Sequence, residues 1–283
     1  LYDPDQAHDT QIFALDHDKV ILDPTFSDDG TTITYIRTNK NLEEALQSDV
    51  YQYHLETKEE RALFSFPSAI TEIEFSPDET SLFYLKAGVF ENYSPIASKR
   101  PHDFDVHEYI MSEDQHIQHT NLKEYAMGSL HIADDGNAVY VQMGDRVEQT
   151  SEDDFDVIER VYEIPLSDPE NMKIVSDPNR EEGIWGFTLI PNSEEMIFKS
   201  IANKDDGGIF QYELYRYNME THEEVQLTHL NAYTTHPVVM PEMDKIYFAV
   251  DQQFGQRYSD YHIYHMNMDG TDVNEVTLPV NGG

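Results

Sequence analysis

The sequence contains no cysteine and few basic residues. Its 283 residues include 18 Lys and Arg against 55 Asp and Glu, which gives a formal net charge of −37. The absence of thiols excludes disulfide bonds, thiol catalysis and cysteine-ligated zinc. The shortage of positive charge argues against nucleic acid, anionic membranes and polyanionic sugars as primary ligands, because each of them requires a basic surface.

Long apolar runs and the common catalytic signatures are also missing. No stretch approaches the ~20 apolar residues that a membrane helix needs. No Gly-x-Ser-x-Gly elbow, phosphate-binding glycine loop or dinucleotide fingerprint occurs, so a hydrolase domain of that type is not expected in this chain. The chain begins with Leu1-Tyr2-Asp3 and shows no signal peptide, which predicts a mature or trimmed segment.

One short phrase recurs five times along the chain. Each copy has an apolar anchor, one or two small residues or a proline, an acidic turn and then an alternating apolar run. The anchors are Phe26, Phe75, Ile132, Leu189 and Val239, separated by 49 to 57 residues. A repeat of this length that contains only strands predicts a β-propeller, with one blade per repeat.

Each repeat is predicted to form four antiparallel strands, two around the acidic turn and two around a later polar turn. The expected blades are approximately residues 23–66, 67–124, 125–178, 179–230 and 231–280 of a single domain. Residues 1–22, with the apolar run Lys19–Leu22 near their end, are expected to form an outer hairpin of a sixth blade. Its inner strands would then lie beyond Gly283; the alternative is a five-bladed ring with an extra hairpin.

The acidic turns themselves are typical of turn chemistry. Asp28-Asp29-Gly30 and Asp134-Asp135-Gly136 supply side-chain acceptors and a residue that adopts positive φ. No stretch has the spaced ligands and closing Glu of a calcium loop. We therefore predict that these residues form turns and do not bind calcium.

The phrases Phe75-Ser76-Pro77-Asp78 and Phe26-Ser27-Asp28-Asp29-Gly30, each followed by an alternating strand, resemble the TolB-type (WD40-like) propeller repeat. The resemblance extends over nearly the whole chain. It implies a secreted, periplasmic or membrane-tethered propeller that binds protein or forms the regulatory part of a serine peptidase. The family also includes metal-dependent lyases, although this chain lacks the basic residues that their acidic sugar substrates need.

The connections between the second and third strands of the repeats are long, and long loops on one rim commonly carry binding residues. They are predicted at about residues 86–103, 143–154, 199–208 and 251–258. The first holds Phe90, Tyr93 and the basic pair Lys99-Arg100. We expect this rim to be the recognition surface.

Alignment on the anchors places one residue of each repeat at the expected mouth of the central channel. These residues are Asp23, Glu72, Ser129, Gly186 and His236, and the single tryptophan, Trp185, precedes Gly186. Asp23, Glu72 and His236 are weak candidates for a divalent-cation or amine site. The alternative is that they solvate the channel and cap the strand starts.

Thirteen histidines are present, and four of them cluster in sequence: His102, His107, His116 and His119. His107 is expected in the third strand of its blade, and His116 and His119 near the following turn and the fourth strand, at the outer edge, where histidines are typically exposed partners of nearby acids. The leading functional prediction is a non-catalytic, extracytoplasmic propeller that binds a protein or peptide and needs no cofactor. The alternatives are a metal-assisted lyase or hydrolase acting at the channel mouth and the regulatory propeller of a larger serine peptidase.

Overall fold

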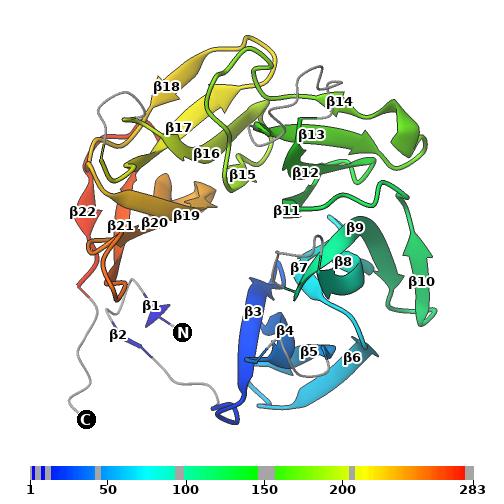
Figure 1. The fold of residues 1–283 in the computed structure, drawn as a ribbon. Coiled ribbons are helices and arrows are strands. Elements are labelled where there is room, and N and C mark those ends of the chain that lie inside the picture. The colour runs from blue at the N-terminus through cyan, green and yellow to red at the C-terminus, as the bar shows by residue number, and fades with distance from the viewer. Residues whose placement is uncertain are drawn as a thin grey trace. The chain divides into compact units, whose positions relative to one another are not determined.

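The computed structural model describes residues 2–3, 8–9, 14–41, 46–92, 99–145, 157–203 and 208–277. Regular structure in this part of the chain consists of strands and short 3-10 helices (Figure 1). The helices are η1 (Pro169–Asn171) and η3 (Pro241–Met243). Strands β1 (Tyr2–Asp3) and β2 (His8–Asp9) pair with each other in a two-stranded sheet.

The first three repeats form four-stranded antiparallel sheets. The first sheet contains β3 (Lys19–Phe26), β4 (Thr32–Asn39), β5 (Ser48–His54) and β6 (Glu60–Phe66) in that order. The second contains β7 (Ile70–Phe75), β8 (Ser81–Asn92), β9 (Lys99–Ile110) and β10 (Gln115–Gln118). The third contains β11 (Met127–Ile132), β12 (Ala138–Gly144), β13 (Glu159–Pro165) and β14 (Lys173–Ile174).

The last two repeats form one larger sheet. The fourth repeat supplies β15 (Phe187–Leu189), β16 (Glu195–Ile201), β17 (Tyr212–Asn218) and β18 (Glu224–Gln226). The fifth supplies β19 (Tyr233–Met240), β20 (Lys245–Asp251), β21 (Tyr261–Asn267) and β22 (Asn274–Glu275). A single parallel pair, Tyr212 with Tyr233, joins β17 to β19. The prediction of an all-β fold built from four-stranded sheets is confirmed.

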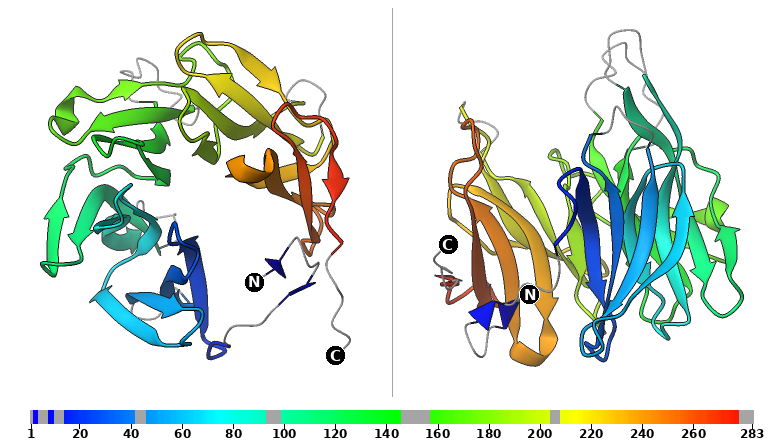
Figure 2. Two further views of the ribbon diagram at one scale, coloured as in Figure 1. Left: turned by 180° about the vertical axis from the view of Figure 1, so that it is seen from behind. Right: turned by 90° about the horizontal axis from the view of Figure 1, so that it is seen from below.

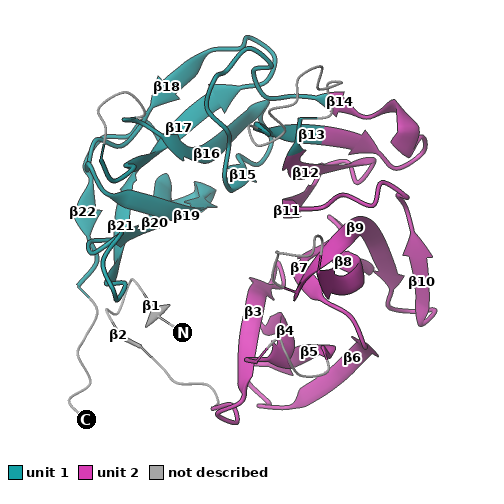
Figure 3. Ribbon diagram, in the orientation of Figure 1, with its two compact units in different colours: residues 1–11, 144–162, 174–283 teal, residues 12–143, 163–173 magenta. Residues whose placement is uncertain are grey.

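The chain divides into two compact units (Figure 3). Unit 1 comprises residues 1–11, 144–162 and 174–283, and unit 2 comprises residues 12–143 and 163–173. Each unit has its own apolar core, formed where neighbouring sheets pack face to face. In unit 2 the core includes Ile36, Val50, Ile73, Leu82 and Tyr84. In unit 1 it includes Ile197, Leu214, Ile246, Phe248 and Met266.

These cores follow from the short apolar runs of the central strands, which are bounded by polar residues. In β16 the buried residues Met196, Ile197 and Phe198 are flanked by partly exposed Glu195 and Lys199. β-Branched and aromatic side chains suit such half-buried pleated surfaces, so the same pattern that predicts a strand also supplies its packing face.

The acidic turns have the predicted role. Asp78 Oδ1 accepts hydrogen bonds from the backbone N–H of Thr80, at 3.1 Å, and from the Thr80 hydroxyl, at 2.8 Å. Asp29 makes the same two bonds to Thr31, at 2.9 and 2.8 Å. Gly30 follows with a φ of 67°, in the left-handed region that favours glycine. The prediction that these turns are built by Asp side chains is confirmed.

Two predicted boundaries are wrong. Lys19–Leu22 does not form a separate hairpin: Lys19 pairs with Asn39 and Leu22 with Ile36, so this segment is the first half of β3. A bulge with a φ of 46° at Asp23 allows the strand to continue through the repeat boundary. Residues 10–13 of the predicted hairpin lie outside the described residues.

The second error concerns the loop predicted at residues 86–103. β8 and β9 remain paired as far as Asn92 with Lys99, and they extend together past the other strands of their sheet (Figure 2). Val89 and Phe90 favour a strand, and the backbone pairs that they complete replace hydrogen bonds to water. The first long connection is therefore mainly a two-stranded ribbon.

Candidate functional site

The residues aligned at the start of the repeats lie at irregularities of the inner strands. Register shifts interrupt the pairing of four inner strands, between Leu22 and Thr25, Ile70 and Glu72, Gly128 and His131, and Thr235 and Val238. Positive φ values occur at Asp23 (46°), Ser129 (52°), Gly186 (81°) and His236 (52°). A β-bulge turns a side chain out of the regular alternation. The sequence alignment therefore found a repeated bulge of the inner strands.

In unit 2 the bulge carboxylates bind the backbone of the next sheet. Asp23 Oδ2 accepts a hydrogen bond from Ile73 N–H at 2.6 Å. Glu72 Oε2 accepts one from Leu130 N–H at 2.6 Å. Asp23 thus links β3 to β7, and Glu72 links β7 to β11. Glu72 and Asp23 have a structural role here, as the alternative reading of the sequence predicts.

A histidine and a second glutamate lie next to these links. Glu74 accepts a hydrogen bond from Ile132 N–H at 3.1 Å, and its other oxygen lies 2.9 Å from His131 Nδ1. The protein atoms that displace water around Asp23, together with the charges of Glu72 and Glu74, raise its pKa to about 7 against the opposing hydrogen bond from Ile73. Burial also raises the pKa of Glu72.

This arrangement predicts an unusual pH dependence for unit 2. An acid whose pKa is higher in the folded state than in the unfolded state binds a proton preferentially when folded. The contribution of Asp23 is therefore fully present below about pH 4 and is lost as the pH rises to about 7. Asp23→Asn keeps an acceptor for Ile73 and tolerates positive φ, so it should remove this loss.

Denaturant unfolding of the wild type and Asp23→Asn at pH 4, 5.5 and 7 measures the difference. We expect Asp23→Asn to be the more stable protein at pH 7 by no more than about 1 kcal/mol, because Asp23 is exposed and water screens its charge. The difference should shrink toward pH 4. A constant difference across this range contradicts the prediction.

Unit 1 brings two predicted site residues, Trp185 and His236, to the same lysine. The backbone N–H of Trp185 donates to the backbone carbonyl of Lys199, on the neighbouring strand, at 2.9 Å. Burial lowers the pKa of His236, and the charge of Lys199 lowers it further. The Lys199 ammonium donates to Tyr233 Oη at 3.0 Å and to Thr235 Oγ1 at 3.3 Å.

An aromatic cluster continues from Lys199 toward the loops. The Lys199 ammonium lies 4.8 Å from the centroid of Tyr233, whose ring stacks on Phe254 at 4.3 Å and 14°. Tyr212 packs edge-on against Tyr233 at 5.0 Å and against Trp185 at 5.7 Å. The cluster therefore connects the inner strands to the β20–β21 connection.

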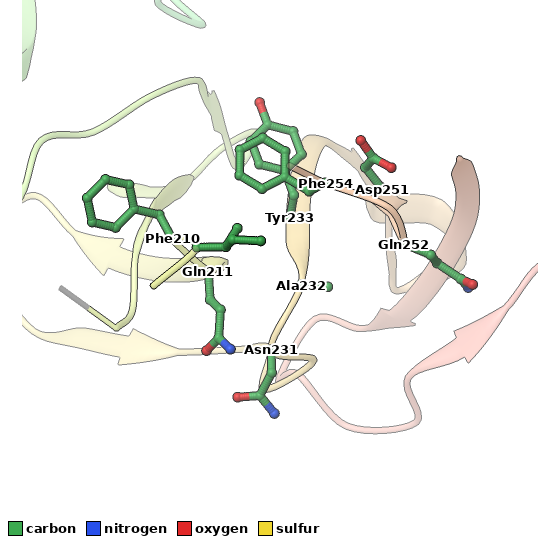
Figure 4. Close-up of a pocket in the computed structure, with 9 residues that line it drawn as sticks. Phe210, Gln211, Asn231, Ala232, Tyr233, Asp251, Gln252 and Phe254 are labelled. Carbon is green, nitrogen blue, oxygen red and sulfur yellow. The ribbon is translucent and has the colours of Figure 1, made fainter. Parts of the chain in front are cut away.

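A pocket of about 190 Å³ opens beside this cluster (Figure 4). Tyr233 and Phe254 form one wall, and Ile209 and Phe210 come from the connection before β17. Asn231 and Gln252 are among the polar residues of the lining. The pocket thus lies among the connections that were predicted to carry recognition.

The pocket has a strongly exposed apolar border. Ile209 is 54% exposed and Phe210 is 48% exposed, and both line the pocket. Ile209 packs so closely on Gly255 that a Cβ there would lie 3.1 Å from its Cδ1, so the two connections contact each other. Gly255 also has a φ of 82°, which favours glycine. Exposed apolar side chains beside a pocket are typical of a surface that binds a partner.

Phe90, Lys99 and Arg100, which were also predicted to bind a partner, lie in unit 2 on the β8–β9 ribbon. The Lys99 ammonium lies 4.4 Å from the centroid of the Phe90 ring, and Arg100 is exposed. Ser129 lies at the bulge of β11. Tyr93 lies outside the described residues. Phe90 and Lys99 therefore contact each other, while Tyr93 stays a prediction.

No group of three or more His, Asp or Glu residues is arranged to hold a metal ion within the described ranges. Asp23 and Glu72 belong to unit 2, and His236 belongs to unit 1. A shared cation site of these three residues stays a prediction.

Sequence reasoning missed Lys199, Tyr233, Phe210 and Phe254. They come from the ends of strands and from connections in two repeats, and they meet only through packing of the fourth and fifth repeats. The sequence offered one weak signal, because a tyrosine occupies the first position of both β17 (Tyr212) and β19 (Tyr233).

Comparison of the structure with solved structures identifies the architecture. A putative TolB from Agrobacterium tumefaciens matches with a TM-score of 0.68 and 14% identity, over 98% of this chain and 86% of that one. TolB from Acinetobacter baumannii matches with a TM-score of 0.60 and 17% identity, over 89% of this chain and 53% of that one. The chain has a TolB-like β-propeller fold.

This propeller fold occurs in proteins of different functions. An oligogalacturonate lyase in complex with manganese matches with a TM-score of 0.58 and 11% identity, over 92% of this chain and 69% of that one. The chain spans about half the length of the Acinetobacter TolB. No family model matches the sequence, and no curated protein matches it. In the described part of the TolB-like propeller, no helix is long and apolar enough to cross a membrane.

Proposed function

We propose that this propeller is a non-catalytic, extracytoplasmic binding protein that recognises a protein or peptide segment through the pocket of unit 1. The observation that carries the proposal is the pocket with its exposed apolar border, Ile209 and Phe210. The resemblance to TolB-type repeats supports the location outside the cytoplasm. A propeller fold by itself does not distinguish binding from catalysis, so the residues of this pocket, and not the fold, support a binding function.

The size of the pocket favours a peptide over a small-molecule substrate. Sites that enclose small molecules usually measure about 300–1,000 Å³. A volume of about 190 Å³ is smaller and suits one side chain of a longer segment, whose neighbours would lie on the exposed border.

The aromatic stack specifies an apolar side chain. An aromatic cage attracts a cation through the open faces of its rings. Here the Tyr233 ring is already occupied by the Lys199 ammonium and by the stacked ring of Phe254. The net charge of −37 favours basic residues elsewhere in the partner, where they can contact the acidic surface.

Selection from a displayed library of random peptides tests this function. Peptides enriched on the wild type are measured on Phe210→Ser, whose replaced side chain is exposed, so folding should be retained. We expect binding to weaken by about tenfold or more, because apolar anchors at the centre of an interface supply most of its affinity.

Val225→Ser is the matched control, since Val225 is also 48% exposed and lies on β18 in the same unit. It should bind the selected peptides like the wild type. Equal binding by all three proteins, or failure to enrich any peptide, contradicts the proposal.

A further inference from the structure

Lys199 differs from other lysines of this acidic chain in its partners. Lys245 lies 3.4 Å from an Asp272 carboxylate oxygen, and Lys173 lies 3.1 Å from Glu163. Within the described residues, the Lys199 ammonium pairs with no carboxylate and is held by the hydroxyls of Tyr233 and Thr235. With 55 acidic and 18 basic residues in the chain, a half-buried ammonium without a carboxylate partner is unexpected.

We propose that Lys199 and His236 bind a carboxylate group of the segment that occupies the neighbouring pocket. This inference rests on the proposed function. The carboxylate would come either from the C-terminus of the partner or from an Asp or Glu side chain, because both present the same pair of oxygens.

The hydrogen-bonding capacity of Lys199 supports the assignment. A lysine ammonium has three donors, and Tyr233 Oη and Thr235 Oγ1 account for two of them. The third donor and the full positive charge remain for an anion. The two neutral bonds also hold the ammonium in place, so little side-chain freedom is lost when a ligand binds.

His236 supplies a second donor from the same strand as Tyr233. Its side chain is exposed and leaves β19 at a bulge with a φ of 52°. Its imidazole interacts electrostatically with Lys199, and a histidine ring offers at least one N–H donor in either protonation state. An incoming carboxylate would therefore receive a donor from each of the two side chains.

Tyr233 connects this anion site to the pocket. Its ring forms a wall of the pocket, and its hydroxyl accepts a hydrogen bond from Lys199. An apolar side chain in the pocket and a carboxylate at Lys199 would thus contact the same residue. The net charge of −37 repels anions at long range, but this repulsion is screened over about 8 Å at physiological salt.

The first experiment follows the His236 ring signals by NMR during titration with sodium acetate, N-acetyl-leucine, N-acetyl-leucine amide and sodium chloride at matched ionic strength. We expect acetate and N-acetyl-leucine to shift the signals, N-acetyl-leucine at lower concentration, and the amide and chloride to leave them unchanged. Equal responses to acetate and chloride overturn the proposal.

Variants at Lys199 provide the decisive comparison. Lys199→Met should lose the acetate response, and Lys199→Arg, which keeps the charge, should retain it. Lys245→Met removes one charge from the same unit at a lysine with a carboxylate partner and should respond like the wild type. If Lys199→Met does not fold, as judged by Trp185 fluorescence, Lys199→Gln, which is also neutral, replaces it and should likewise lose the response. A retained response in the folded variant contradicts the site.

The library-selected peptides separate this inference from the proposed function. They are synthesised with free or amidated C-termini, and with Asp and Glu replaced by their amides. We expect one of these changes to weaken binding by about tenfold on the wild type and to have no effect on Lys199→Met. If selected peptides bind the wild type and Lys199→Met equally, the carboxylate site is wrong and the peptide function stands. If no peptide is selected but the acetate response depends on Lys199, the peptide function is wrong and the carboxylate site stands.

Discussion

Replacing Arg160 by Met is expected to lower the free energy of unfolding by about 3 kcal/mol. Arg160 is only 2% exposed, and its guanidinium donates to three backbone carbonyls of the segment that follows β14. The acceptors are Arg180 O at 2.5 Å, Pro178 O at 3.3 Å and Glu182 O at 3.5 Å. Methionine fills a similar volume but leaves these carbonyls without a donor, and each such loss costs about 1–3 kcal/mol.

The single tryptophan gives a direct readout of this effect. Trp185 belongs to unit 1 together with Arg160 and its three acceptors, so its fluorescence during denaturant unfolding reports the affected unit. Arg257→Met is the control, because Arg257 is an exposed arginine of the same unit. It should change stability by less than about 0.5 kcal/mol. Similar losses in both variants would show that the buried guanidinium is not the cause.

The repeat phrase predicted most of the fold because its signals are local. Alternating apolar residues predict the strand, and Asp side chains such as Asp29 and Asp78 bond to the backbone two residues later. The β3 boundary could not be predicted in this way. The local sequence around Asp23 is compatible both with a strand that ends there and with a strand that continues through a left-handed bulge, as β3 does.

The candidate site was only partly accessible from the sequence. Alignment of the anchors located His236 and drew attention to Trp185, since both lie at the repeated inner-strand position. Lys199, Phe210 and Phe254 obey no common spacing. They meet because the fourth and fifth repeats pack together at the starts of β17 and β19. A local sequence pattern does not encode such packing.

The histidine cluster shows the same limit. His107 was expected in the third strand of its blade, and it lies there on β9, but its burial was not predicted. It is 7% exposed on β9, and its ring stacks on buried Tyr84 at a centroid distance of 5.2 Å. The register of β9 against β8 pairs these two residues directly. Burial of a histidine in a packed sheet has a consequence for acid stability.

We expect unit 2 to lose about 3 kcal/mol of stability through His107 as the pH falls from about 6.5 to about 4. Burial, together with the positive charges of Lys86, His116 and His119, lowers the pKa of His107 to about 4. The unfolded imidazole binds its proton near pH 6.5, whereas the folded one stays neutral. The unfolded state is therefore favoured increasingly below pH 6.5, in the direction opposite to the effect of Asp23.

His107→Phe keeps an aromatic ring against Tyr84 and removes the titrating group. Its free energy of unfolding should fall less than that of the wild type between pH 7 and pH 4, by about 3 kcal/mol. Far-UV circular dichroism follows both units, and Trp185 fluorescence follows unit 1, where the variant should match the wild type. His17→Phe, at an exposed position of unit 2, should retain the wild-type pH dependence. Parallel pH profiles for His107→Phe and the wild type would refute the assignment, because only a group that titrates differently in the two states can tilt the profile.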